Sequence, residues 1–339
     1  MTLKYVQIET TTVCNQRCYF CPVSLERRSK EKMSMAIFDK IVAGIRAYPL
    51  ENVHISGFNE PTYDKELVER VARLNQAGFE VLITTNASGL KPALTMDLLK
   101  AGVTTFVINL STLDETQYYQ SRGTHDLKRV ISHIQFLLAE VEKQNDKIEV
   151  KLLIVGHLDK QHSLNIQQVM TAFSNSTVPD FVISPLSDFA GKPTDMLSKS
   201  PFYHKTLRGC ATGRQNQWLH FVPSGEAILC CQDYLGHYKI GHIAQNSATE
   251  IEQGEQLSQF RRWVSGEESA PEDFICRTCV FALSDDSYAD KLQKLFCQCC
   301  VLADELGIEN ACQRCVISAY TKVGLCRSEA TCSPCEIER

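Results

Sequence analysis

The sequence is organised around the stretch Cys14-Asn15-Gln16-Arg17-Cys18-Tyr19-Phe20-Cys21, three thiols at a Cx3Cx2C spacing. The segment just before it, Tyr5 to Thr10, alternates apolar and polar residues as a β-strand does, so the thiols fall on a loop at a strand's carboxyl end. Three thiols are an incomplete metal set, because structural zinc takes four protein ligands and a 4Fe-4S cluster takes a ligand on each iron. A cluster bound here would keep one iron open for a small molecule. Zinc binding and buried free thiols are the alternatives.

This spacing resembles that of the radical SAM superfamily, in which Cx3Cx2C holds a 4Fe-4S cluster whose open iron is chelated by S-adenosylmethionine (SAM). Phe20, the aromatic residue before the third cysteine, also matches the family. The resemblance implies that Cys14, Cys18 and Cys21 are the cluster ligands and that Phe20 belongs to the cofactor site. It further implies reductive cleavage of SAM to a 5'-deoxyadenosyl radical, with electrons from a low-potential donor such as flavodoxin or ferredoxin.

Composition and charge restrict the class of protein. The chain has 339 residues, 44% of them hydrophobic, which suits one large or two smaller globular domains. A net charge of -5 gives no electrostatic sign of a nucleic-acid partner. Residues 1–12 carry no signal-peptide pattern, and no apolar run approaches the length of a membrane span. We therefore expect a cytoplasmic protein without a membrane partner, whose CxxC pairs bind metal or clusters; a secreted disulfide scaffold is the alternative.

The cysteines are unevenly distributed along the chain. No cysteine lies between Cys21 and Cys210, and 13 of the 16 follow from Cys210 onward. We therefore expect three parts: a barrel over residues 1–195, an auxiliary-cluster domain over 196–285 and a Cys-rich tail over 286–339.

Short β-prone runs alternate with longer helical runs over the first part, which predicts an α/β fold with ligands gathered at the strands' carboxyl ends. The expected strands are Tyr5 to Glu9, Asn52 to Ser56, Glu80 to Thr85, Thr105 to Leu110, Ile148 to Val155 and Asp180 to Ile183. The expected helices are Ala36 to Ala47, Lys65 to Ala77, Thr95 to Ala101, Leu127 to Lys143 and Ser163 to Ser174, with Gly78 and Gly102 as helix-ending glycines. The resemblance implies that these repeats form the partial (β/α)6 radical SAM barrel.

The loop after the second expected strand reads Ser56-Gly57-Phe58-Asn59-Glu60-Pro61. It resembles the family's glycine-glutamate motif, in which a glycine permits close backbone approach and polar groups accept hydrogen bonds from the SAM ammonium. Asn59 stands where the family more often has glycine, and Glu60 is retained. The resemblance implies that both bind the cofactor; the alternative is an ordinary loop in which Pro61 starts a helix.

Three more strand ends resemble the family. Thr84-Thr85-Asn86-Ala87 resembles its TNG-type strand end and places Asn86 at the cofactor. Ser111, after the fourth strand, stands where a serine hydroxyl commonly meets the SAM ribose, although it also suits a helix N-cap before Asp114. Arg122, in Tyr118-Tyr119-Gln120-Ser121-Arg122-Gly123, corresponds to an arginine that pairs with the SAM carboxylate.

The Cys-rich third opens with Cys210, fourteen residues, Gly225, four residues and Cys230, followed later by Cys276-Arg277-Thr278-Cys279. This pattern resembles the SPASM/twitch extension, a small Cys-rich iron-sulfur domain with a β-hairpin. Pro223 to Glu226 is the hairpin turn expected between strands at Trp218 to Val222 and Ala227 to Cys231. The resemblance implies one auxiliary 4Fe-4S cluster on Cys210, Cys230, Cys276 and Cys279, in the shorter twitch arrangement; a zinc ribbon on the same thiols is the alternative.

The tail carries many further thiols, namely Cys297, Cys299, Cys300, Cys312, Cys315, Cys326, Cys332 and Cys335. They can form a second auxiliary cluster, a small zinc knot or extra ligands for the other clusters, and their spacing does not decide among these.

An auxiliary cluster can accept the electron left on a substrate radical, which favours a net two-electron oxidation in which a base takes a proton. Asp233 is the candidate base, with a structural carboxylate as the alternative. Cys231 can instead return a hydrogen atom and give epimerisation, with a buried small apolar residue as the alternative. Histidines such as His220 show no ligand spacing and are expected to be surface or core residues.

The substrate is the least determined feature. Since the first expected strand begins within ten residues, we expect no N-terminal leader-binding module, which favours a small molecule such as a sugar or aminocyclitol. The cysteine arrangement also resembles that of the twitch-containing aminocyclitol dehydrogenases. The alternatives are maturation of a ribosomal peptide and, from another class, a non-catalytic zinc-binding interaction protein.

Overall fold

The structure is a computed structural model that describes residues 3–144, 148–157, 159–186 and 203–285. The predictions made for the tail, residues 286–339, lie outside the described residues.

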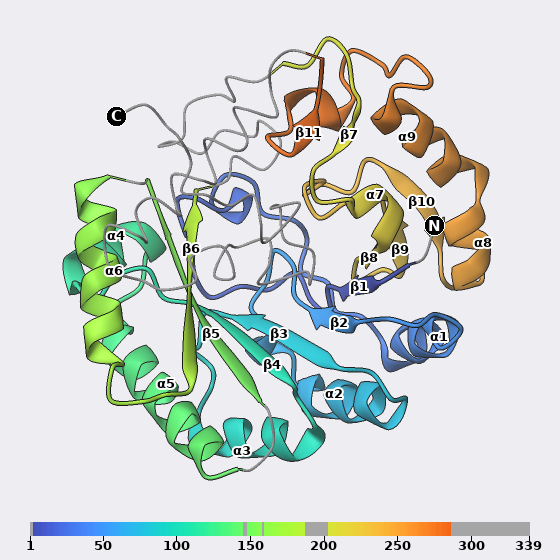
Figure 1. The fold of residues 1–339 in the computed structure, drawn as a ribbon. Coiled ribbons are helices and arrows are strands. Elements are labelled where there is room, and N and C mark those ends of the chain that lie inside the picture. The colour runs from blue at the N-terminus through green and yellow to red at the C-terminus, as the bar shows by residue number, and fades with distance from the viewer. Residues whose placement is uncertain (1–2, 145–147, 158, 187–202, 286–339) are drawn as a thin grey trace, which may run out of the picture.

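Six parallel strands form the first part of the fold, in the sheet order β1-β2-β3-β4-β5-β6 (Figure 1). Their bounds are β1 (Tyr5–Ile8), β2 (Asn52–Ile55), β3 (Val81–Thr85), β4 (Thr105–Asn109), β5 (Glu149–Gly156) and β6 (Pro179–Pro185). Sheet order follows chain order, so each crossover leads to the next strand and all six carboxyl ends meet at one edge. The partial (β/α)6 barrel predicted from the sequence is confirmed.

Helices lie along the outer side of this curved sheet (Figure 1). They are α1 (Met35–Ile45), α2 (Leu67–Gln76), α3 (Pro92–Ala101), α4 (Glu115–Arg122), α5 (Leu127–Glu142) and α6 (Lys160–Ala172). Gly102 ends α3 with φ +95 and Gly78 follows α2 with φ +88, as predicted for helix-ending glycines. Helix α4 was not predicted from the sequence, because its short, polar stretch has little helical periodicity.

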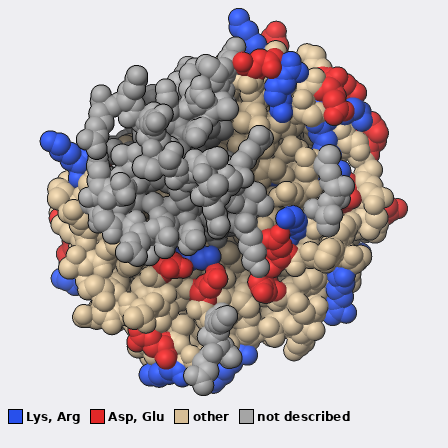
Figure 2. Space-filling model, viewed as in Figure 1, with Lys and Arg blue, Asp and Glu red and all other residues tan. Residues whose placement is uncertain are grey.

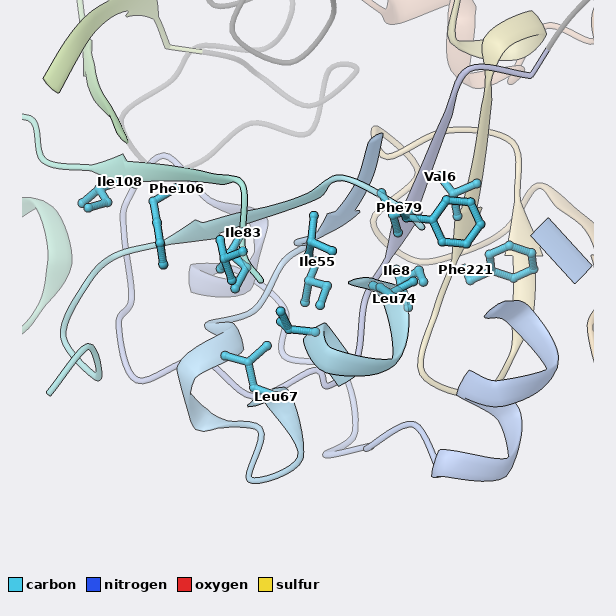
Figure 3. Close-up of a cluster of buried hydrophobic side chains, with 14 of the residues drawn as sticks. Val6, Ile8, Ile55, Leu67, Leu74, Phe79, Ile83, Phe106, Ile108 and Phe221 are labelled. Atoms are coloured by element: carbon cyan, nitrogen blue, oxygen red, sulfur yellow. The ribbon is translucent and has the colours of Figure 1, made fainter. Parts of the chain in front are cut away.

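The core lies between the sheet and its helices. Figure 3 shows apolar side chains of β1 to β4 in this core, with Leu74 of α2 beside Ile8 of β1 and Leu67 on the side of Ile55 and Ile83. The side chains that alternate with these point to the inner face, where Leu82, Val107, Leu153 and Val182 form a second, smaller cluster. On β1 and β2 the side chains that alternate with the core residues include the polar Gln7 and His54.

The Cys-rich third continues the same sheet. Strand β8 (Trp218–Phe221) pairs in parallel with β1, and β9 (Glu226–Ile228) and β10 (Lys239–His242) follow antiparallel, giving the order β10-β9-β8-β1. The predicted hairpin at Pro223 to Glu226 is confirmed. The remaining elements are β7 (Gly209–Cys210), α7 (Arg214–Gln217), α8 (Ala248–Gln253), α9 (Glu255–Ser265) and β11 (Ala282–Leu283), with short 3-10 helices η1 (Pro22–Ser24), η2 (Pro61–Tyr63) and η3 (Ile275–Thr278).

The visible surface carries charges of both signs. Lys and Arg side chains alternate with Asp and Glu around the face seen in Figure 2. No helix in the described part of the chain is long and apolar enough to cross a membrane.

Candidate cluster and cofactor site

The three cysteines of the Cx3Cx2C stretch lie on the loop between β1 and η1, and each is a half-buried free thiol. Burial raises the pKa of Cys14 and Cys21 to about 12. These thiols are therefore protonated at neutral pH until a metal displaces the proton, as expected for ligands that ionise only when they bind.

Backbone hydrogen bonds hold this loop on two sides. The N–H of Glu60, after β2, donates to the carbonyl of Val13 at 3.0 Å. The N–H groups of Arg17 and Tyr19 donate to carbonyls at the end of α4, at 2.9 and 3.1 Å. The fold itself thus positions the loop. Helix α4, which was not predicted from the sequence, accepts two of these three hydrogen bonds.

Arg122 lies beside the triad and is 1% exposed. Its Nη1 donates to the side-chain oxygen of Gln16 at 3.2 Å and to the Sγ of Cys18 at 3.8 Å, and its Nη2 donates to Asn109 at 2.7 Å. The Arg122 Nε has no partner, and no carboxylate pairs with it among the residues that the structure describes. A buried guanidinium without an anion is costly. A cysteine-bound cluster and the SAM carboxylate are both negatively charged, so either could neutralise this unpaired guanidinium.

Asn59 gives a second sign of fit. Both its side-chain oxygen and its side-chain nitrogen are buried without a hydrogen-bond partner in the described part of the chain. Buried amides are normally satisfied, so this one calls for a ligand with both a donor and an acceptor, as the amino-acid part of SAM has. Two residues earlier, a Cβ at Gly57 would lie 2.7 Å from the Cγ of Glu9, so only glycine allows the backbone this close.

Glu60 is already held by the protein. It is 1% exposed and accepts hydrogen bonds from the hydroxyls of Thr62 and Thr85, both at 2.6 Å, and from the N–H of Asn86 at 2.7 Å. It also caps the three-residue 3-10 helix η2, which begins at Pro61. Glu60 therefore joins the ends of β2 and β3, and direct contact with SAM stays a prediction.

Asn86 and its neighbour form a tight bend at the end of β3. The Asn86 amide donates to Asn15 at 3.0 Å and accepts from the N–H of Ser88 at 2.9 Å, which ties β3 to the cysteine loop. Ala87 has φ +61, a left-handed conformation that costs a non-glycine residue energy and concentrates at functional sites.

Ser111 connects the ends of β4 and β5. Its hydroxyl accepts from the N–H of Val155 at 3.1 Å and donates to Asn109 at 3.2 Å. The alternative reading of Ser111 as a helix N-cap is wrong, because Asp114 caps α4 by accepting from the N–H of Gln117. Contact of Ser111 with the SAM ribose stays a prediction.

The four cysteines assigned to an auxiliary cluster come from three elements. Cys210 ends β7, Cys230 follows β9, and Cys276 and Cys279 flank the end of η3. Cys210 pairs with Ala282 in the β7–β11 ladder, which brings the CxxC pair to Cys210. Burial raises the pKa of Cys276 well above its usual value, and the charges of Cys279 and Cys210 raise it further. Cys210, Cys276 and Cys279 thus lie near one another, and their role as cluster ligands stays a prediction.

Backbone N–H groups already point at two of these sulfurs. Gln232 donates to the Sγ of Cys230 and Phe281 donates to the Sγ of Cys279, both at 3.4 Å. Such hydrogen bonds stabilise thiolate sulfur in iron-sulfur proteins. Among the described residues, no three His, Cys, Asp or Glu side chains are grouped closely enough to hold a single metal ion.

Cys231 and Asp233 lie in the loop after β9. A hydrogen bond with Cys230 lowers the pKa of the Cys231 thiol, and the charge of Arg214 lowers it further. Asp233 is 3% exposed, and its Oδ2 accepts from the N–H of Tyr238 at 2.7 Å. That bond is one a structural carboxylate makes, so the role of Asp233 as a base stays a prediction.

A chain of contacts joins the two cysteine sites. The hydroxyl of Tyr234, four residues after Cys230, donates to the carbonyl of Glu26 at 2.5 Å. The guanidinium of Arg28 lies 4.8 Å from the centre of the Tyr234 ring and makes two hydrogen bonds to Glu9, at 2.8 and 2.5 Å. The loop that leaves the triad thus packs against the loop that leaves Cys230.

Several of these residues were missed by sequence reasoning. Asn15 and Gln16 lie inside the Cx3Cx2C stretch, and Asn109 lies at a strand end, so their positions were a usable signal. Glu9 and Arg28 are separated by a loop and carried no such signal.

Comparison with known proteins places the chain in a family. Residues 8–161 match the radical SAM superfamily, and residues 210–280 match the SPASM iron-sulfur cluster-binding domain. The chain belongs to the radical SAM enzymes. Within them it is a member with a C-terminal SPASM domain, so it uses a 4Fe-4S cluster with SAM and an auxiliary iron-sulfur cluster.

Curated relatives are distant. A probable GTP 3',8-cyclase of Pyrococcus abyssi is 28% identical over 130 residues, which is 38% of this chain and 42% of that protein. A tungsten-containing aldehyde ferredoxin oxidoreductase cofactor-modifying protein of Pyrococcus furiosus is 27% identical over 301 residues, 76% of this chain and 83% of that protein. The match to the cyclase thus spans less than half of its length.

Solved structures share the fold at low identity. Streptococcus suis SuiB bound to the precursor peptide SuiA has a TM-score of 0.62 at 16% identity, covering 82% of this chain and 70% of SuiB. The anSMEcpe structure with bound AdoMet has 0.60 at 13%, covering 91% and 99%. BtrN in complex with AdoMet and 2-DOIA has 0.52 at 14%, covering 79% and 89%. These likenesses establish the fold alone.

Proposed function

We propose that this chain oxidises a small molecule, such as a sugar or an aminocyclitol, by two electrons at a C–H bond. Bound SAM and its cluster supply the 5'-deoxyadenosyl radical that takes a hydrogen atom from the substrate. One electron and one proton then remain to be removed, the electron to the auxiliary cluster and the proton to a base.

The observation that carries this proposal is the contact chain between the two cysteine sites. Tyr234 belongs to the loop of Cys230 and bonds to the loop that follows Cys21. A substrate bound near that loop would lie between a hydrogen acceptor and an electron acceptor, which is what a net oxidation requires.

The residues of the first site have distinct tasks in this proposal. Cys14, Cys18 and Cys21 hold three irons, while Arg122 and Asn59 bind the amino-acid part of SAM through the groups that the protein leaves unpaired. Glu60, Asn86 and Ser111 keep the strand ends in place around them. Pre-positioned polar groups of this kind need no rearrangement when the cofactor binds.

The substrate radical can react in two ways, which depend on Asp233 or on Cys231. If Asp233 accepts the proton, the product is oxidised. If Cys231 gives a hydrogen atom to the substrate radical, the product is an epimer and a thiyl radical must be reduced in turn. We favour oxidation, because Cys231 shares a hydrogen bond with Cys230 and is thereby drawn to the auxiliary site.

The cysteine spacing supports a small-molecule substrate over a peptide, because it resembles that of the twitch-containing aminocyclitol dehydrogenases. BtrN, which shares the fold, was solved with 2-DOIA. A peptide substrate is the second candidate, because SuiB was solved with a precursor peptide and anSMEcpe with the Cp18Cys peptide.

The test begins with anaerobically purified protein. We expect about eight iron and eight sulfide per chain from two 4Fe-4S clusters, and about twelve if the tail holds its own. Dithionite and SAM alone should then yield 5'-deoxyadenosine. The double variant Cys210→Ala and Cys276→Ala should lose about four iron and still cleave SAM, whereas Cys14→Ala should abolish cleavage. Stoichiometric zinc without sulfide, and intact SAM, would show that the protein is a zinc-binding module.

A further inference from the structure

Arg214 is the first residue of α7, four positions after Cys210 (Figure 1). The N–H of Gly213 donates to the carbonyl of Cys210 at 3.0 Å, so the turn that carries Cys210 leads directly into Arg214. The guanidinium lies 4.9 Å from the centre of the Trp218 ring, which fixes one of its faces. The cation is therefore held in one place by the backbone and by an aromatic ring.

No carboxylate pairs with this cation within the described part of the chain. Arg214 makes no ion pair with any described residue, and its Nε is buried without a hydrogen-bond partner. Arg261 makes a useful contrast, because it also packs on α7, donating to the carbonyl of Gln215 at 3.0 Å, but pairs with Glu252 at 2.8 Å. Around α7, Arg261 is therefore neutralised by a carboxylate, whereas Arg214 is not.

Cysteine side chains are the acidic groups whose charge, once they ionise, acts on Arg214. Burial lowers the pKa of Arg214, but the charges of neighbouring cysteines more than offset this and raise it. Those cysteines are Cys231, Cys230, Cys210 and Cys279. Three of the four, Cys210, Cys230 and Cys279, are proposed ligands of the auxiliary cluster. The unpaired guanidinium of Arg214 therefore lies close to the proposed cluster site.

We propose that Arg214 is the buried counter-charge of the auxiliary cluster and makes that cluster easier to reduce. The inference rests on the proposed function for the existence of the cluster, and adds the residue that sets its potential. Four thiolates give a 4Fe-4S cluster a net negative charge, and an added electron increases it. A fixed positive charge in a poorly solvated site stabilises the reduced state more than the oxidised state. Arg214 would thus help the cluster to accept the electron left on the substrate.

The experiment measures the midpoint potential of the auxiliary cluster by EPR-monitored titration. A background with Cys14→Ala, Cys18→Ala and Cys21→Ala removes the SAM cluster, so that its signal does not interfere. Arg214→Gln removes the charge and Arg214→Lys keeps it. The double variant Arg261→Gln and Glu252→Gln is the matched control, because it removes a neutralised ion pair from the same region. Iron and sulfide are measured for each variant.

We expect Arg214→Gln to make one-electron reduction at least about tenfold less favourable, a shift of about 59 mV to more negative potential. Arg214→Lys and the double variant Arg261→Gln and Glu252→Gln should stay within a fraction of that shift. Loss of the cluster from Arg214→Gln with retention in Arg214→Lys would also support the charge. An unchanged potential in a fully loaded Arg214→Gln, or equal cluster loss in both Arg214 variants, would overturn the inference. Zinc without sulfide in the unsubstituted chain would instead overturn the proposed function.

Discussion

Arg122 donates a hydrogen bond to the Sγ of Cys18 across 3.8 Å, from the end of α4 to the centre of the cysteine loop. These residues are separated by 104 positions, and the same guanidinium has no carboxylate partner in the described part of the chain. The pair couples a proposed cluster ligand to the guanidinium that we propose binds the SAM carboxylate.

Replacing Arg122 with Gln should weaken SAM binding by about 10- to 100-fold, because a hydrogen bond to a charged group contributes roughly 1.5–3 kcal/mol. Equilibrium binding of SAM to the anaerobic, cluster-loaded protein measures this. Arg129→Gln is the control, since Arg129 is exposed and paired with Asp126. Equal SAM affinity in Arg122→Gln and in the unsubstituted protein, with iron content intact, would remove Arg122 from the cofactor site.

The Glu9–Arg28 pair should stabilise the junction between the two cysteine sites. Their side chains are 5% and 17% exposed, so Arg28→Met leaves a largely buried carboxylate and should cost about 2–4 kcal/mol of unfolding free energy. The double variant Glu9→Gln and Arg28→Met should recover part of that loss. Urea unfolding measures both, with the exposed pair Arg73 and Asp39 as control, where Arg73→Met should change stability by less than about 1 kcal/mol. Additive losses at Glu9 and Arg28 would argue against a coupled pair.

Ala87 should tolerate glycine but not valine. Its φ of +61 suits glycine, while its side chain is fully buried, so the backbone gain and the lost methyl contact of Ala87→Gly should nearly cancel, to within about 1 kcal/mol. Ala87→Val puts a β-branched residue in a left-handed conformation and should cost more than about 2 kcal/mol. Thermal unfolding gives both values. Similar stabilities for the two variants would mean that the bend relaxes easily.

Stability should fall in mild acid because of buried histidine. Burial, together with the charges of Arg214 and Lys151, lowers the pKa of His54 to about 3. In the unfolded chain the imidazole has its ordinary pKa of about 6.5, so between these values only the unfolded state takes up the proton. The contribution is complete above about pH 6.5 and is lost as the pH falls toward 3, by on the order of 1 kcal/mol per pH unit.

Urea unfolding at pH 7 and pH 5 tests this dependence. His54→Gln should reduce the loss of stability between the two pH values, whereas His125→Gln, at an exposed position, should leave it unchanged. An identical loss in His54→Gln and the unsubstituted chain would show that His54 is not responsible.

Much of the fold could be predicted from the sequence, and the ligand set stays a prediction. The Cx3Cx2C stretch, the alternation of strand and helix and the hairpin turn at Gly225 are local patterns, and each acts within a few residues of itself. They identified the six barrel strands and both groups of cysteines.

Only the tertiary structure decided which residues meet. Strand β8 extends the barrel sheet beside β1 although 210 positions separate Ile8 and Trp218, a pairing with no local signature. Arg122 reaches Cys18 by the same kind of long-range contact. The tertiary structure also showed that Glu60 is held by protein donors while Asn59, Arg122 and Arg214 keep unpaired polar atoms. A sequence motif states which chemical groups are present. Whether a buried group already has its partner depends on residues far along the chain, which only folding brings within hydrogen-bond distance.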